Sequence, residues 1–516
     1  MTSPATMAVN LDGSADSAGP VRGTQSLPHV GMIWLAANLV VTTLLTGTLF
    51  VPGVSFGTAT TMILLGTLIG VVVLVLVGNI GTRTGLPTMA ITRGAFGIRG
   101  SLLPAAANLI ILMGWSWVQA MLAGVTVDYL VHEATGFSNP ALFSAICQGI
   151  VVVLAIFGHT GISRVEPWLA LAILVVMGFV FAAAFGAFGI SDFAAIPVDP
   201  ELGATPFTTL DIVIATAISW TVLSADMNRH AKTSTAGIVG SGIGYTLSTV
   251  IAMLLGLVAF STVLLRDGDA APFDPTVIVS EFGWPLGIAI FLSVMATNTM
   301  VVFGMVTSVV NAQSKWHLRF LPTAIVLGVI SVIGSTFLGL LDQFTDFLFV
   351  ISAFFVPVFA IMIADYYLLK RRAYSRQILH ETPASRYWYR GGVNWIAVVV
   401  WVIGAALSYL LSYVVPSPLG ANIPAFAASF LLYLVLMLLL GRALGLRDPR
   451  DPEPTGHLLD QIATEEIAQP ARSTQAGPER SARPAQANRD PAEGDPAQGD
   501  PAQGGPARPT DPGAKD

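Results

Sequence analysis

Trp115 and Gln119 are two side chains with binding chemistry, and they stand four residues apart in an otherwise apolar stretch. In a helix this spacing places both on one face, one turn apart. An indole offers a flat apolar plate, and a glutamine amide offers both hydrogen-bond donors and an acceptor. The pair therefore suits a planar heterocycle with amide-like edges. The alternative is that the tryptophan serves packing alone.

Two other apolar stretches are rich in hydroxyl side chains. One reads NLVVTTLLTGTLFVPG and contains Thr43 and Thr46, and the other reads DIVIATAISWTVLSADMNR and contains Thr216 and Ser219. Interrupted membrane helices expose backbone groups to a substrate or an ion, often at matching places in two repeats. We expect Thr43 and Thr46 to contact a cation, and Thr216 and Ser219 to line a substrate site. The alternative is that these small polar residues only pack helices together.

A third stretch carries Ser293, Thr297 and Asn298. Ser293 and Thr297 share a helix face, and hydroxyl and carbonyl oxygens are ligands that a hard cation such as Na⁺ prefers. The two are therefore candidate sodium ligands. Asn298 is a candidate substrate ligand, directly or through a neighbour, with hydrogen bonding between helices as the alternative.

Asp226 is the acidic residue nearest the second hydroxyl-rich stretch, and Arg229 follows three residues later. If protons are coupled to transport across the membrane, Asp226 is the best proton carrier, because all seven histidines lie in loops or tails. Its closeness to Arg229 favours a structural or gating ion pair.

The composition indicates a protein that spans a membrane many times. Of 516 residues, 53% are hydrophobic and 11% charged, against about 25% charged in soluble domains, and the mean hydropathy is +0.70. The single Cys147 excludes a disulfide framework and a thiolate metal cluster. No basic stripe suggests a nucleic-acid partner. No nucleophile motif, buried histidine or metal cluster suggests an enzyme, so we expect no catalytic residues and no cofactor.

Twelve apolar runs are long enough to cross about 30 Å of hydrocarbon. They lie near residues 31–51, 57–78, 101–130, 141–158, 165–188, 207–226, 236–265, 284–310, 319–340, 344–369, 393–415 and 422–444.

The basic residues between these runs predict the orientation of the chain. The loops after even-numbered runs hold fourteen: Arg83, Arg93, Arg99, Arg164, Arg229, Lys232, Lys315, Arg319, Lys370, Arg371, Arg372, Arg376, Arg386 and Arg390. The loops after odd-numbered runs hold Arg266 alone. Basic loops stay in the cytoplasm, so we expect a cytoplasmic (inner) membrane protein with both termini in the cytoplasm.

The two ends differ from the rest in composition. Residues 1–30 are polar and lack the apolar core of a signal peptide. Residues 447–516 are rich in Pro, Ala, Gly and Asp, with GDPAQGDPAQGGPA near the end. We expect both ends to be disordered and residues 31–446 to form one membrane domain.

Six motifs follow one another along the membrane domain. They are GNIGTRTGLPTMAITRGAFGIRG at 78–100, GWSWVQ at 114–119, SADMNRHAK at 224–232, ATN at 296–298, PVFAIMIADYYLLKRR at 357–372 and YRGGVNWIA at 389–397. With this set the chain resembles the nucleobase–cation symporter-1 family of purine, cytosine and hydantoin permeases.

The resemblance implies a LeuT-like fold with a five-plus-five inverted repeat. Repeat one would span about 31–190 and repeat two about 205–370, with two added helices at about 393–444. It also implies alternating access around a central site, in which Trp115 stacks on the substrate and Gln119 reads its edge.

Two positions depart from the family pattern. The second stacking aromatic is replaced by Ala217, so Trp220, three residues later, is our candidate for that role. Sodium-using members carry two hydroxyls where this chain has Ala296 and Thr297, so both Na⁺ and H⁺ stay open as the coupling ion.

The sequence therefore predicts a symporter that imports a nucleobase or related N-heterocycle, such as cytosine, a purine, a hydantoin or allantoin. One alternative is a transporter of a decorated heterocycle, such as a thiamine or hydroxymethylpyrimidine precursor. The other is a membrane sensor built on a transporter fold.

Overall fold

The computed structural model describes residues 19–157, 159–267, 270–310, 318–415, 417, 419–446 and 457–463. Their regular structure is helical, and the long helices are strongly apolar. Eight of the described helices are long and apolar enough to cross a membrane: α3 (Phe56–Thr84), α5 (Leu102–Thr135), α6 (Pro140–Phe157), α11 (Ser234–Asp267), α13 (Trp284–Val310), α15 (Phe344–Ile363) with η5 (Ala364–Leu369), α16 (Trp395–Tyr409) with η8 (Leu410–Val414), and α17 (Asn422–Leu440).

A ninth span is a broken helix. α1 (Leu27–Asn38) and α2 (Val41–Thr48) meet at a bend of 58°. The interruption that the sequence predicts here is confirmed, but it lies at Leu39 and Val40 and not within the threonine run. The threonines stay helical because their hydroxyls donate back to the same helix, as Thr46 does to the Thr42 carbonyl over 2.8 Å.

The second predicted interruption is also present. Two residues separate the end of α9 (Pro206–Thr221) from the start of α10 (Ser224–Asn228). α7 (His159–Ala187) and α14 (Phe320–Gly334) occupy the fifth and ninth predicted runs. α9 and α14 have 16 and 15 residues, fewer than the roughly 20 that a straight span needs.

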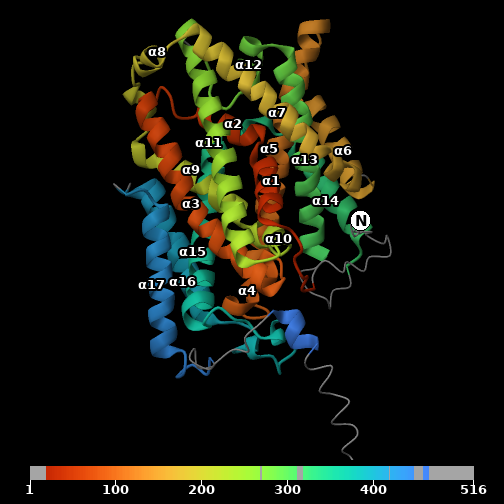
Figure 1. The fold of residues 1–516 in the computed structure, drawn as a ribbon, viewed down its shortest axis with the longest axis vertical. Helices are drawn as coiled ribbons and strands as arrows, with labels where there is room; N and C mark the ends of the chain where they lie inside the picture. Colours follow the sequence, from red (N-terminus) through yellow and green to blue (C-terminus); the bar gives the residue numbers. More distant parts are fainter. Residues whose placement is uncertain are drawn as a thin grey trace, which may run out of the picture. The chain divides into compact units, whose positions relative to one another are not determined.

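The helices of the described chain pack in two main groups (Figure 1). In the first group, α1, α2, α3 and α9 to α11 contact one another, with α11 touching α1, α2 and α3. In the second, α5, α6, α13 and α14 contact one another. α15, α16 and α17 pack together beside α9.

Small residues set the closest approach between helices of the first group. A Cβ added to Gly256 of α11 would collide with the Leu44 carbonyl oxygen of α2, and one added to Gly47 would collide with the Met253 carbonyl oxygen. The two helices therefore touch backbone to backbone, which is how small residues serve helix association in membranes.

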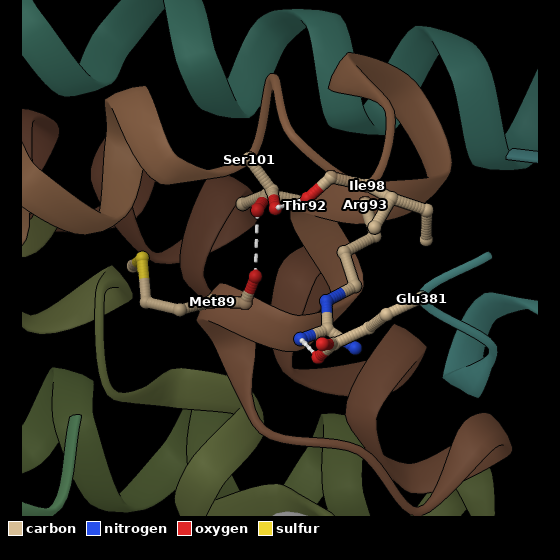
Figure 2. A network of polar contacts seen from close by, with 6 residues as sticks. All are labelled: Met89, Thr92, Arg93, Ile98, Ser101 and Glu381. Atoms are coloured by element: carbon tan, nitrogen blue, oxygen red, sulfur yellow. Dashed lines mark hydrogen bonds and ion pairs between the residues drawn. The ribbon is translucent and has the colours of Figure 1, made fainter. Parts of the chain in front are cut away.

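The arginines of the 78–100 motif bind the segment that follows α15. Arg93, on the short helix α4 (Thr88–Phe96), pairs with Glu381 over 2.9 Å, and both side chains are largely buried (Figure 2). Arg83 donates to the Tyr366 hydroxyl over 3.0 Å, and the Arg99 guanidinium lies 4.9 Å from the Trp388 ring centroid. These contacts give the motif a structural role.

The predicted disorder of the two ends needs correction where the structure describes them. Val21 donates to the Gly85 carbonyl, Gln25 donates to the His230 carbonyl, and α1 begins at Leu27. Near the other end, residues 457–463 contain a short helical segment whose Leu458 is 1% exposed. Apolar and backbone contacts hold both segments, which composition alone does not reveal. Residues 1–18, 447–456 and 464–516 lie outside the described residues.

Candidate substrate and cation sites

Trp115 and Gln119 lie on one face of α5, as their spacing predicts. The Trp115 ring meets the rings of Phe344 and Phe347 of α15 edge to face, at centroid distances of 5.8 and 5.5 Å. Gln119 is 4% exposed, and its amide has no hydrogen-bond partner among the described residues. This face of α5 thus combines an aromatic ring with a buried amide that is open to a ligand.

The hydroxyls of Thr216 and Ser219 bond within their own helix. Thr216 donates to the Ile212 carbonyl over 3.0 Å, and Ser219 donates to the Thr216 carbonyl over 2.8 Å. Both residues are buried. Each hydroxyl oxygen keeps lone pairs that accept a hydrogen bond from a ligand.

Trp220 packs on α1. Its ring lies 6.3 Å from the Trp34 ring, at an interplanar angle of 67°. The Trp34 indole in turn donates to the Asn228 amide oxygen over 2.8 Å. The role of Trp220 as a second plate opposite Trp115 stays a prediction.

The break between α1 and α2 is held by Asn38, which the sequence analysis did not single out. Asn38 is fully buried, accepts from the Thr43 hydroxyl over 3.1 Å, and donates to Ser248 and Thr249 of α11. One amide thereby links both halves of the broken helix to a neighbouring helix. Thr43 lies in α2 and bonds across the break to Asn38, whereas Thr46 bonds back into α2.

Ser293 and Thr297 share one face of α13, and α13 lies against α2. Thr297 donates to the Ser293 carbonyl over 3.0 Å. The Ser293 hydroxyl is buried and has no hydrogen-bond partner among the described residues. Hydroxyl and carbonyl oxygens thus gather on a helix next to the broken one, and such oxygens suit a hard cation.

A family model described as "Permease for cytosine/purines, uracil, thiamine, allantoin" matches residues 22–434. The chain belongs to this family. It is a membrane permease, a secondary transporter, and the sensor alternative is disfavoured because the related proteins are permeases.

Three curated relatives of this permease illustrate the family. The putative purine-cytosine permease YxlA of Bacillus subtilis is 27% identical over 73% of this chain and 82% of its own length. The hydantoin permease of Microbacterium maritypicum is 27% identical over 67% and 73%. The cytosine permease of Escherichia coli is 24% identical over 83% and 95%.

Solved structures of the transporter Mhp1 share the fold of the permease. The inward-facing conformation has a TM-score of 0.72 at 20% identity and covers 86% of this chain and 98% of Mhp1. The closed conformation with bromovinylhydantoin bound has a TM-score of 0.68 at 21% identity, with the same coverage.

In this permease Asn298 connects helices. It is fully buried, and its amide nitrogen donates to the Gln148 side-chain oxygen over 2.8 Å and to the Ser116 carbonyl over 3.2 Å. These bonds agree with hydrogen bonding between helices, while the buried side-chain oxygen of Asn298 has no hydrogen-bond partner among the described residues, so its role as a substrate ligand stays a prediction. Gln148 was missed, although an amide inside an apolar run is a signal that sequence reasoning could have used.

Asp226 caps a helix. Its carboxylate accepts from the backbone N–H of Thr88 over 3.0 Å, and the Thr88 hydroxyl accepts from the Ala225 N–H over 3.1 Å. These reciprocal bonds join α10 to the first turn of α4, where a negative charge is favourable. Arg229 is 6% exposed and interacts electrostatically with Asp226, which agrees with the structural or gating role considered for the pair.

His230 follows in the loop between α10 and α11. Burial and, to a smaller degree, the charge of the neighbouring Arg229 together lower its pKa to about 4. The imidazole is therefore neutral at physiological pH.

Proposed function

We propose that this permease imports a planar N-heterocycle of the nucleobase, hydantoin or allantoin type together with a cation, by alternating access. The observation that carries the proposal is the face of α5 with the Trp115 ring and the Gln119 amide one turn apart. A ring that stacks and an amide that pairs with ring edges are the complement of such a substrate. The names of the relatives support the same class.

A decorated heterocycle, such as a thiamine or hydroxymethylpyrimidine precursor, is the second candidate. Trp220 packs on Trp34, and Ala217 lies where the family pattern has its second aromatic. Alanine is smaller than an aromatic residue, which leaves more space for a substituent on the substrate.

A thermal-shift screen of the purified permease against cytosine, hypoxanthine, uracil, allantoin, hydantoin and thiamine tests this proposal. A ligand at 100 times its Kd stabilises the folded state by about 2.7 kcal/mol, which is readily measured as a rise in Tm. Uptake of the radiolabelled hit into proteoliposomes then separates transport from binding. If none of these compounds raises Tm or enters the vesicles, the proposed substrate class is wrong.

For the coupling ion we favour Na⁺, bound by Thr297, Ser293 and carbonyls at the α1–α2 break near Thr43. The position of α13 against α2 supports this arrangement. Na⁺ must regain by ligation what it loses in hydration, and Ala296 removes one hydroxyl of the family pattern. The alternative is H⁺ carried by Asp226, although its role as the cap of α4 speaks for a structural function.

Ala296→Ser should restore the missing oxygen and lower the Na⁺ concentration that gives half-maximal uptake. Uptake into proteoliposomes at graded external Na⁺, with choline as the replacement cation, measures this. Uptake that ignores Na⁺ but collapses with a protonophore and in Asp226→Asn would establish the proton alternative instead.

The topology completes the proposal. We place α7, α9 with α10, and α14 as the remaining spans, which gives twelve, with α1 to α7 and α9 to α15 as inverted repeats and α16 and α17 as the added helices. The distribution of basic residues supports two cytoplasmic termini and a place in the cytoplasmic membrane.

A further inference from the structure

Four fully buried polar side chains from four helices form one hydrogen-bonded network beside the substrate face of α5. They are Ser116 of α5, Gln148 of α6, Asn298 of α13 and Ser331 of α14. The Gln148 amide nitrogen donates to Ser116 Oγ over 2.9 Å and to Ser331 Oγ over 2.6 Å. The two hydroxyls are 3.0 Å apart. Gln148 thus contacts every other member of the network.

The network binds α5 through both the side chain and the backbone of one residue, Ser116. Gln148 holds the Ser116 hydroxyl, while Asn298, itself bound to Gln148, donates to the Ser116 carbonyl. A rotation of α5 by one residue would turn this position by about 100° and shift it by about 1.5 Å. Every bond to Ser116 would then break, and the hydrocarbon core offers no water to replace them.

Packing between α5 and its neighbours also constrains the position of this helix. Gly124 of α5 packs on the backbone of Ser144 of α6, where a Cβ would lie 2.5 Å from Ser144 Cα. Directional bonds between buried polar groups specify one arrangement out of several that pack comparably.

Ser116 is the immediate neighbour of Trp115 and lies three residues before Gln119. Because a helix moves as a rigid unit over one turn, the bonds at Ser116 fix both side chains of the substrate face. Gln119 has no hydrogen-bond partner of its own among the described residues. The position of its amide is therefore set through the helix that carries it.

We propose that Gln148 is the positioning residue of the substrate site, setting the rotation and register of α5 and hence the placement of Trp115 and Gln119. The kind of ligand that the site binds rests on the proposed function. The role of Gln148 in positioning α5 does not. Recognition by stacking and hydrogen bonds requires placement within about 0.5 Å. Loss of the network should therefore alter recognition more than stability.

Gln148→Met tests this, because it keeps an unbranched side chain of similar length and removes both hydrogen-bonding groups. The matched control is Ser144→Ala on the same helix, which removes a bond from α6 to the Ser335 carbonyl and leaves the network intact. Both variants lose bonds between buried helices, so a purely structural role predicts similar effects for both.

The first readout needs no ligand. In protein labelled with 5-fluorotryptophan, the ¹⁹F resonance that disappears in Trp115→Phe belongs to Trp115. That resonance should shift or broaden in Gln148→Met and stay in place in Ser144→Ala. The milder Ser331→Ala, which removes one acceptor of Gln148, should shift it less and serves if Gln148→Met does not fold.

The second readout is binding of cytosine, hypoxanthine, uracil, allantoin and hydantoin, followed by thermal shift. For any compound that the wild type binds, Gln148→Met should weaken binding about 10- to 100-fold, as expected for a site displaced by about 1 Å, and change the ranking of the compounds. Ser144→Ala should keep the ranking. If the wild type binds none of them, the proposed substrate class fails, and the ¹⁹F resonance of Trp115 alone tests the role of Gln148. An unchanged Trp115 resonance in folded Gln148→Met protein overturns the proposal.

Discussion

The indole of Trp115 is half-buried and touches Phe344 and Phe347 edge to face, at interplanar angles of 71° and 73°. If its ring covers a flat substrate, Trp115→Ala should weaken substrate binding by about 1–3 kcal/mol, which is about 5- to 150-fold, as for stacking of bases on aromatic side chains. Trp115→Phe should lose less, because a smaller ring still stacks. Isothermal titration of the purified variants measures both.

A useful control lies two residues away. The indole of Trp117 packs where a side chain on Gly334 of α14 would lie, so Trp117→Phe should leave affinity close to the wild-type value. Unchanged affinity in folded Trp115→Ala protein would remove Trp115 from the site.

Gln119 should determine which ring edges are accepted. Gln119→Leu keeps the volume of the side chain and removes its donors and its acceptor, so the matching groups of the substrate are left unpaired in a dry site. Each such loss costs about 1–3 kcal/mol. Competition by ring analogues that lack one edge group measures the effect. A variant that ranks the analogues as the wild type does would show that Gln119 does not read the edge.

At the scale of single residues, spacing predicted which side chains share a helix face, but not what that face contacts. Trp115 and Gln119 lie together because the α-helical repeat alone decides it. The expected roles of Trp220 and Asn298 depended on which neighbour each one faces. That is set by long-range contacts, of Trp220 with Trp34 and of Asn298 with Gln148, which one sequence does not contain.

At the scale of helices, the close contact between α2 and α11 depends on glycines, which have no side chain. Gly256→Ala should destabilise the protein by about 1–3 kcal/mol, because the added methyl group meets the Leu44 backbone. Gly242→Ala is the matched control on the same helix, since its Cβ would lie 3.6 Å from Val75 Cγ1, an ordinary contact. Thermal unfolding in detergent compares them, and equal Tm values would contradict the close packing.

Both interrupted helices were predictable, but the first break lies at Leu39 and Val40, before the threonine run that marks the region. Hydroxyl-rich composition marks the region, because threonine and serine satisfy carbonyls near an interruption. The residue that fixes the break is Asn38, through its bonds to Thr43 on one side and to α11 on the other. Its partners on α11 lie more than 200 residues away along the chain.

At the scale of the whole chain, the described segments near both ends bind to connections between the helices. Gln461 donates to the Tyr374 carbonyl over 3.1 Å, and Asp460 pairs with Arg22. Leu458→Glu should release the segment 457–463, because it places a charge at a position that is 1% exposed. Limited proteolysis of the purified protein should then cut this segment faster than in the wild type.

The control for that change is Ala463→Glu, which adds the same charge at an exposed position. If both variants are cut at the wild-type rate, residues 457–463 are not held by Leu458. Composition predicted this part of the chain to be disordered, since one buried leucine among many polar residues hardly changes an average. The membrane domain was easier to predict, because a long apolar run in lipid must form a helix to satisfy its backbone hydrogen bonds.

The burial of Cys147 has a practical consequence. It is the only thiol of the chain, it lies in α6, and it is 3% exposed, so it should react slowly with alkylating reagents. A cysteine introduced at Leu202, which is 59% exposed, would then be the one readily modified group, and so would a cysteine introduced at the exposed Arg371. A membrane-impermeant maleimide added to intact cells should label the first and spare the second. Because its own thiol reacts slowly, the natural sequence is suited to cysteine labelling that reports which side of the membrane each loop occupies.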